Sequence, residues 1–208
     1  MLRFVDHLVF ATPDLDEGIR RIERVFDAHV TPGGRHKHWG TRNALVSLGE
    51  TTYLEIIGPD PERSTRETPH LFRIDQIDEP RLVTWAAKGA NLSGIVASAR
   101  SRGVDLGNSS QGSRLLPDGT ELRWRLTDPY AERVGGVIPF FVDWGETTHP
   151  ATALPSQCEL ITVNLEHPHP EQAERAMRAV GITTQVAAGD TSQIRATIRT
   201  PNGIVELT

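Results

Sequence analysis

Hydrophobic and polar residues follow two successive patterns at the start of the chain. Phe4 to Ala11 has the composition of a β-strand. The next segment carries an apolar stripe at Leu15, Ile19, Ile22 and Phe26, with charged residues at most positions between them. Steps of three and four residues predict an amphipathic helix, and its single apolar face indicates that it covers a sheet.

Three strands are expected after this helix. Residues 29–31, Ala44 to Leu48 and Thr51 to Ile57 have strand composition, and Gly49-Glu50 joins the last two. Residues 1–60 therefore have the order strand, helix and three strands (βαβββ), and we treat them as the first module.

The same order returns, more loosely, in residues 81–146. Arg81 to Ala87 is an expected strand, Asn91 caps an expected helix that ends near Gly103, and strands follow around residues 115–116, 120–126 and 137–142. Residues 61–80 are rich in charge and proline and are expected to link the two modules.

A third, shorter βαβββ-like module is expected over residues 157–208. Its strand Glu159 to Leu165 is followed by a helix over Glu171 to Val180 and by a hairpin turned at Pro201-Asn202-Gly203. No module of this size could bury a sheet face alone, so the modules should pack together. The sequence thus predicts an α+β protein with repeated βαβββ modules.

Composition narrows the partners and the compartment. The chain has 208 residues, with 22 Lys and Arg against 27 Asp and Glu, which gives a net charge of −5. An acidic chain does not attract phosphate backbones, so no nucleic-acid partner is expected. No run of about 18 apolar residues indicates a membrane span. The single Cys158 has no thiol partner or basic neighbour, so we expect an inert thiol and a cytoplasmic location.

Strand alternation identifies the first candidate site. It places Val5, His7, Val9 and Ala11 on one face and Phe4, Asp6, Leu8 and Phe10 on the other. Glu55 lies in the same way opposite Leu54 and Ile56. The apolar faces suit the amphipathic helix, so His7 and Glu55 are expected to point into one shared cavity.

A carboxylate among apolar neighbours needs a cation, a donor or water, because its desolvation costs several kcal/mol. His7 and Glu55 are therefore candidate ligands of one divalent metal ion, or an acid/base pair. The alternative for His7 is a structural histidine bonded to backbone. Glu206 is a candidate third ligand, with a solvent-exposed terminal strand as the alternative.

The segment from Gly33 to Asn43 could act as a ligand clamp. Arg35 could hold a carboxylate through two hydrogen bonds, and His36 could transfer a proton near neutral pH. Asn43 and Trp144 are further candidate ligand contacts, and Trp39 could cover a ligand. A solvated hairpin connection is the alternative for this segment. Since no glycine-rich nucleotide-binding motif is present, no nucleotide cofactor is expected.

Several motifs together carry a family resemblance. They are Asp6-His7-Leu8-Val9-Phe10-Ala11-Thr12-Pro13-Asp14-Leu15, Thr31-Pro32-Gly33-Gly34-Arg35-His36, Gly40-Thr41-Arg42-Asn43, Tyr53-Leu54-Glu55 and Pro139-Phe140-Phe141-Val142-Asp143-Trp144-Gly145. In these the chain resembles the glyoxalase-like branch of the vicinal oxygen chelate superfamily. The resemblance implies paired modules that form a cup-shaped, partly open β-barrel with helices outside.

The resemblance also implies a divalent metal held by a His on the first strand and a Glu on the last strand of each module. His7 and Glu55 match in the first module. Trp85 lies near the corresponding first-strand position of the second module, and Phe140 or Phe141 near the last-strand position. In the third module Thr162 takes the histidine position while Glu206 matches the glutamate, so no two modules supply a full set.

We therefore expect a protein that binds a small oxygen-rich metabolite in the cup, with metal-assisted isomerase, lyase or dioxygenase chemistry. Its catalytic residues are not assigned from the sequence. The alternative is a non-catalytic protein of the same fold that sequesters a small molecule. The extra module could also mediate a homodimer.

Overall fold

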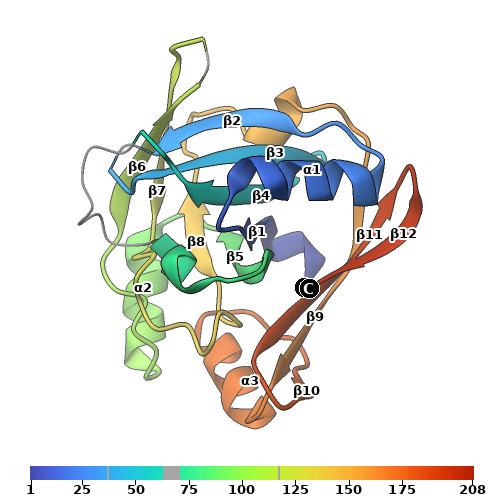
Figure 1. The fold of residues 1–208 in the computed structure, drawn as a ribbon. Helices are drawn as coiled ribbons and strands as arrows, with labels where there is room; N and C mark the ends of the chain where they lie inside the picture. The colour runs from blue at the N-terminus through green and yellow to red at the C-terminus, as the bar shows by residue number, and fades with distance from the viewer. Residues whose placement is uncertain (37, 63–70, 117) are drawn as a thin grey trace.

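The computed structural model describes residues 1–36, 38–62, 71–116 and 118–208. Eight strands form a closed barrel in the order β1-β4-β3-β2-β6-β7-β8-β5 (Figure 1). Their bounds are β1 Val5–Ala11, β2 Thr31–His36, β3 Thr41–Gly49, β4 Thr52–Pro59, β5 Arg81–Lys88, β6 Ser110–Leu115, β7 Glu121–Leu126 and β8 Phe140–Asp143. The predicted α+β class and β-barrel are confirmed.

Two seams join the half of the barrel built from β1–β4 to the half built from β5–β8. At the first seam, β1 and β5 run antiparallel along most of their length. The second seam is narrow, since Arg35 and Leu115 are the one pair between β2 and β6 within the described residues. This pair closes the barrel.

Two α-helices lie outside the barrel. In α1 (Leu15–Phe26) the predicted stripe is buried at Leu15, Ile22 and Phe26, and Asp14 caps the helix by accepting a hydrogen bond from the Glu17 N–H. In α2 (Leu92–Ser101) the predicted cap Asn91 accepts from the Gly94 N–H. Short 3₁₀ helices occur at Leu2–Phe4 (η1), Leu71–Gln76 (η2) and Pro150–Ala153 (η3).

The C-terminal part forms a second sheet in the order β10-β9-β11-β12, with α3 (Pro170–Ala179) beside it (Figure 1). Its strands are β9 Glu159–His167, β10 Ala187–Ala188, β11 Gln193–Thr200 and β12 Gly203–Leu207. Side chains of this sheet, among them Leu165 and Ile198, share one buried core with Leu8 and Phe10 of the barrel. The apolar face of this sheet is therefore covered by the barrel of the same chain.

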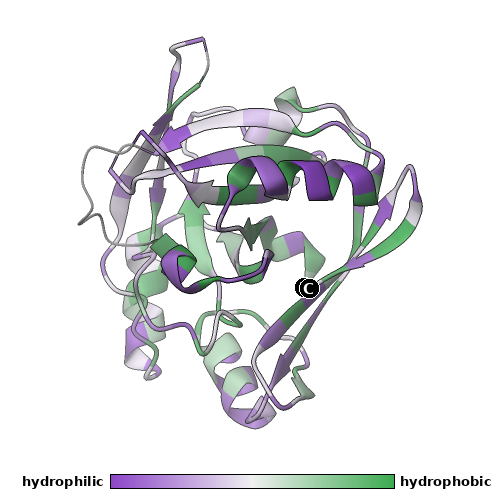
Figure 2. Ribbon diagram, viewed as in Figure 1, coloured by the Kyte–Doolittle hydropathy of each residue, from purple (hydrophilic) through white to green (hydrophobic). Residues whose placement is uncertain are grey.

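The opposite face of the second sheet is polar. Arg195 forms ion pairs with Glu166 and Glu206, and Arg199 pairs with Glu159. The ribbon coloured by hydropathy shows polar and apolar positions alternating along these strands (Figure 2). The turn between β11 and β12 returns to the barrel, where the Asn202 side chain donates to the Val25 carbonyl near the end of α1.

A bulge in β1 changes the expected alternation. Val5 pairs with Ala87 and His7 with Ala86, so Asp6 is an extra residue in the β1–β5 ladder. Val5 consequently joins the outer core, where Leu8 and Phe10 also lie. The prediction that Val5 shares a face with His7 was wrong, because strict alternation does not hold across a bulge.

Some predicted features lie partly outside the described residues. The proposed linker over 61–80 includes residues 63–70, and the proposed clamp includes Lys37. Cys158 is buried, and burial raises the pKa of its thiol to about 11, in agreement with an inert thiol. None of the helices in the described part of the chain is long and apolar enough to cross a membrane.

Candidate functional site

The interior of the barrel contains a small hollow with a cavity volume of about 30 Å³. Of the residues that the structure describes, fourteen line it: His7, His36, Trp39, Asn43, Tyr53, Glu55, Leu71, Phe72, Arg114, Trp124, Leu126, Phe140, Val142 and Trp144. Four of the predicted site residues on β1–β4 are among them, namely His7, His36, Asn43 and Glu55. The strand alternation therefore placed His7 and Glu55 correctly in one cavity.

His7 is held by its neighbour in the chain. Its Nδ1 lies 2.7 Å from Asp6 Oδ1, and both side chains are buried. The same carboxylate accepts a hydrogen bond from Trp144 Nε1 at 3.1 Å and lies 3.3 Å from His149 Nε2. Because an ionised carboxylate only accepts, the His7 proton lies on Nδ1 and Nε2 presents its lone pair to the other side of the ring.

Asp6 is ionised at neutral pH. Burial by itself raises the pKa of this carboxyl group, but the hydrogen bonds and charges of His149 and His7 together outweigh burial and lower its pKa to about 2. Asp6 therefore acts as a fixed negative charge behind His7. Strict alternation predicted Asp6 on the opposite face, and the bulge in β1 explains why its carboxylate reaches His7.

Glu55 lies across the hollow from this pair. Its Oε2 is 3.8 Å from His7 Nε2, which is longer than a hydrogen bond. Its other oxygen, Oε1, accepts a hydrogen bond of 2.5 Å from Asn43 Nδ2. Asn43 Oδ1 in turn accepts from Arg114 Nη1 at 3.0 Å and from the Gly34 N–H at 2.9 Å. Asn43 thus fixes the orientation of Glu55.

His36 lines the same hollow as a neutral imidazole. Burial lowers its pKa to about 4, and the nearby charge of Glu55 opposes this only in part. Its Nδ1 lies 3.1 Å from Thr41 Oγ1. A neutral imidazole can donate one hydrogen bond to a ligand oxygen without carrying a charge.

Arg114 is a site residue that the sequence patterns did not indicate. Its side chain is buried, and within the described residues its Nε has no hydrogen-bond partner and no carboxylate forms an ion pair with it. The sequence predicted a strand near residues 115–116, but the pattern of residues does not indicate which strand it pairs with. Pairing of β6 with β2 brings Arg114 beside Asn43, and this contact spans 71 residues of chain.

The rest of the hollow has apolar walls. Phe140 contacts His7 edge-on at 5.5 Å between ring centroids, and Tyr53 stacks on the other side of His7 at 4.6 Å. The ring centroid of Trp124 lies 5.4 Å from that of Trp144 and 6.4 Å from that of Trp39. Such walls exclude water and strengthen the electrostatic interactions inside.

In the second half of the barrel, the residue that faces the hollow from β5 differs from the one expected from the sequence. Trp85 does not face the hollow, because its ring is buried in the outer core and Nε1 donates to the Val137 carbonyl at 2.8 Å. Ala86, the residue paired with His7, packs instead with Phe140 and Val142, and these two side chains line the hollow. This half therefore contributes apolar groups where the resemblance implied ligands.

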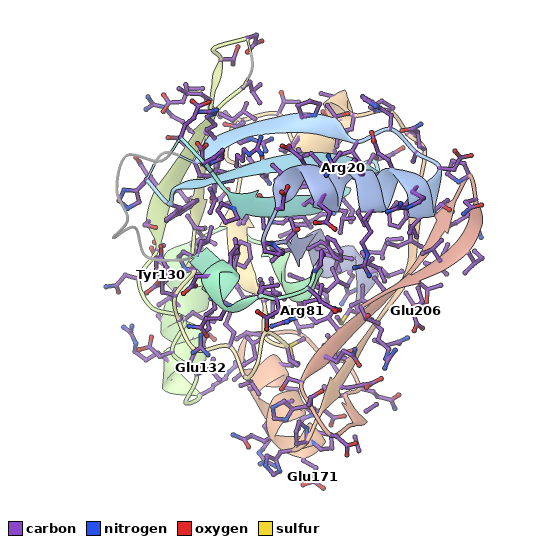
Figure 3. All side chains as sticks on the ribbon, viewed as in Figure 1. Arg20, Arg81, Tyr130, Glu132, Glu171 and Glu206 are labelled. Carbon is purple, nitrogen blue, oxygen red and sulfur yellow. The ribbon has the colours of Figure 1, made fainter. Side chains whose placement is uncertain are left out.

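Two other candidates lie away from the hollow. Arg35 forms ion pairs with Glu62 at 2.5 Å and Asp60 at 3.6 Å, and it borders an outer depression next to β6. Its contact with a ligand remains a prediction. Glu206 does not complete the site, because it projects from β12 on the outer face of the second sheet and pairs with Arg195 (Figure 3).

The donor set is incomplete for a metal ion. Members of this superfamily typically use a divalent metal, and catalytic zinc and iron sites take three protein ligands. Within the ranges that the structure describes, no group of three His, Cys, Asp or Glu side chains is placed to hold one. Asn43 Oδ1 is already occupied by two donors. The residues present do not fit a complete site, and the role of His7 and Glu55 as ligands stays a prediction.

The fold is an eight-stranded barrel of βαβββ modules, with a histidine and a glutamate that face one hollow. The chain belongs to the glyoxalase-like domain family, whose model matches residues 5–181. This result confirms the resemblance that the motifs carry. No curated protein matches the chain significantly.

Solved structures resemble this chain to different degrees, and the first of those below has the same fold. A hypothetical protein from Staphylococcus aureus is 14% identical, with a TM-score of 0.71, and 98% of each chain is covered. Methylmalonyl-CoA epimerase from Mycobacterium tuberculosis is 22% identical over 67% of this chain and 86% of its own, with a TM-score of 0.46. A methylmalonyl-CoA epimerase in complex with methylmalonyl-CoA and NH4⁺ is 21% identical over 73% and 98%, with a TM-score of 0.48.

Proposed function

We propose that this protein is an enzyme that moves a proton at a carbon next to a carbonyl group of a small oxygen-rich metabolite. The observation that carries the proposal is the pairing of His7 Nδ1 with the buried Asp6 carboxylate, which leaves Nε2 free to accept a proton. A histidine with one nitrogen bound to a carboxylate and the other directed at a ligand is a typical general base.

Glu55 complements His7. The 3.8 Å between His7 Nε2 and Glu55 Oε2 is too long for a direct hydrogen bond, so both groups can face the same ligand atom or two neighbouring atoms. A proton taken by His7 from one carbon can return to an adjacent position or to the other face of that carbon. Isomerisation, epimerisation and elimination all share this first step.

The neutral His36 is suited to a second role, the stabilisation of the oxyanion that forms when the proton is removed. Removal of a proton next to a carbonyl group leaves negative charge on its oxygen, and catalysis requires a donor for that charge. His36 faces the hollow and stays neutral because of its lowered pKa. Its ring can donate a hydrogen bond to the developing oxyanion, while the aromatic walls exclude water from the intermediate.

Hydrogen–deuterium exchange tests the proposal without a known substrate. A mixture of small 2-oxo acids, hydroxyketones and their amides is incubated with the protein in D₂O, and mass spectrometry detects a gain of deuterium. We expect exchange with the wild type, and its loss in His7→Gln and Glu55→Gln. Exchange that persists in both variants at the wild-type rate would overturn the proposal.

Metal analysis separates the two roles of the pair. Exchange by protein stripped with a chelator supports the acid/base role. Exchange that needs an added divalent ion, with the ion lost in His7→Ala and Glu55→Ala, would instead support the metal-ligand role predicted from the sequence.

Sequestration of a small molecule is the second candidate function. It is favoured by the three tryptophans Trp39, Trp124 and Trp144, which line one hollow and offer large rigid contact areas. Binding of a ligand from the mixture without any deuterium gain in it would favour sequestration over the enzyme.

A further inference from the structure

We infer that the ligand of the barrel carries a carboxylate, and that Arg114 binds it. The inference rests on the proposed function in one respect, since it takes the inner hollow as the ligand site. It adds the chemical class of the ligand, which is a small carbonyl compound with an acid group close to the reacting carbon.

Arg114 carries a buried positive charge that lacks a directly bonded counter-charge among the described residues. A guanidinium removed from water needs a partner, because burial of an unpaired charge costs several kcal/mol. Only 5% of the surface of Arg114 is exposed, and the one side-chain hydrogen bond that it forms within the described residues goes to the neutral amide of Asn43. Its Nε has no partner among the described residues. A bound carboxylate would supply the missing counter-charge.

The position of Arg114 is the second argument. It lines the inner hollow together with His7 and Glu55, and it also borders the outer depression beside β6. One amide group, that of Asn43, separates its Nη1 from Glu55 Oε1. A carboxylate bound at Arg114 therefore lies within a few bonds of an atom that faces His7 and Glu55.

The local backbone is built to admit this side chain. Gly34 of β2 has no side chain, and a Cβ there would stand 3.4 Å from Arg114 Cδ and 2.3 Å from the Leu115 carbonyl oxygen. The glycine thus leaves room for the β6 strand and for the stem of Arg114 at the narrow seam. Gly34, which the sequence placed in a ligand clamp, therefore makes space for β6 and the Arg114 side chain.

Carboxylate specificity follows from the other charges. The ionised Asp6 lies behind His7, so a second anion is repelled on that side of the hollow and is attracted at the Arg114 side. This arrangement orients an acid with one charged end. The carboxylate faces the β2–β6 seam, and the carbonyl group faces His36 and His7.

Pyruvate and its neutral analogue pyruvamide test the inference directly. Binding is measured by calorimetry on the full chain. We expect pyruvate to bind the wild type, pyruvamide to bind about tenfold more weakly or worse, and Arg114→Gln to lose the same factor for pyruvate, since a charged hydrogen bond is removed. Arg100→Gln, an exposed arginine on α2, is the matched control and should bind as the wild type does.

A second variant covers the case in which Arg114→Gln does not fold. Arg114→Lys keeps the charge but lacks the planar fork, so it should bind pyruvate more weakly than the wild type and more tightly than Arg114→Gln. Equal binding of pyruvate by the wild type and both variants would overturn the inference. Equal binding of pyruvamide and pyruvate by the wild type would do the same, and so would a failure of pyruvate, malonate and acetoacetate alike to bind at millimolar concentration.

The outcome also separates this inference from the proposed function. His7→Gln should still bind pyruvate, because Arg114 is intact, but should not exchange its methyl protons in D₂O. Carboxylate binding that depends on Arg114 without any exchange would leave the inference standing and remove the enzyme. Exchange on neutral compounds only would leave the enzyme standing and remove the inference.

Discussion

His7 Nδ1 forms a hydrogen bond of 2.7 Å to Asp6 Oδ1, although the two residues are adjacent in one strand. The bulge in β1 makes this possible, and Trp144 and His149 complete the shell around the same carboxylate. This pairing decides which His7 nitrogen carries the proton. It therefore gives the most direct test of the proposed chemistry.

Asp6→Asn should slow proton exchange strongly while the barrel stays folded. An amide can donate to His7 and shift its proton from Nδ1 to Nε2, which removes the base. We expect the exchange rate to fall by about 100-fold or more, the typical contribution of a general base. Nitrogen-15 NMR of the His7 ring reports the proton position.

The matched control is Asp16→Asn, an exposed carboxylate of α1. It should leave both the exchange rate and the His7 ring signals unchanged. An Asp6→Asn protein with the wild-type exchange rate would show that Asp6 has a purely structural role.

His36 should make the protein less stable in mild acid. Burial lowers its pKa from 6.5 to about 4, so the unfolded chain binds this proton more readily than the folded chain does. The stabilisation is complete above pH 6.5 and decreases as the pH falls toward 4, by up to about 3 kcal/mol. Urea unfolding at several pH values measures it.

The variant His36→Gln isolates this effect. Its free energy of unfolding should depend less on pH between 6.5 and 4 than that of the wild type, whatever its absolute stability. Asp6 contributes in a lower window, because a pKa of about 2 means that its contribution is lost only as the pH falls from about 4 toward 2. An unchanged pH dependence in His36→Gln would contradict the neutral buried state of His36.

The sequence predicted what depends on local periodicity. Alternation along β1 and β4 placed His7 and Glu55 in one hollow, and the stripe of α1 placed that helix outside the barrel. Alternation failed at Asp6, because a bulge shifts the register and leaves no mark in the order of hydrophobic residues. Arg114 could not be found either, since its contact with Asn43 depends on a non-local pairing of β6 with β2.

Gly34→Ala should open the narrow seam of the barrel. The added Cβ would meet the Leu115 carbonyl oxygen at 2.3 Å, and Leu115 pairs with Arg35 where β6 joins β2. We expect a loss of about 1–3 kcal/mol in the free energy of unfolding, the usual effect of overpacking. Binding of pyruvate should weaken as well, because Arg114 moves with β6.

Gly103→Ala gives the comparison for Gly34→Ala. Gly103 has a φ of +84° with nothing within 4 Å of an added Cβ, so its substitution introduces backbone strain without a clash. It should reduce stability without affecting pyruvate binding. If Gly34→Ala also left binding intact, the seam would not control the position of Arg114.

Trp85→Phe should destabilise the fold and leave the site intact. The Trp85 ring is fully buried in the outer core, and its N–H satisfies the Val137 carbonyl. The smaller ring leaves a cavity and an unpaired carbonyl, which together should cost about 2–4 kcal/mol. Thermal unfolding measures the loss, and proton exchange at a temperature below the transition should match the wild type per folded molecule. Loss of exchange in folded Trp85→Phe would instead place this strand position in the site, as the family resemblance implied.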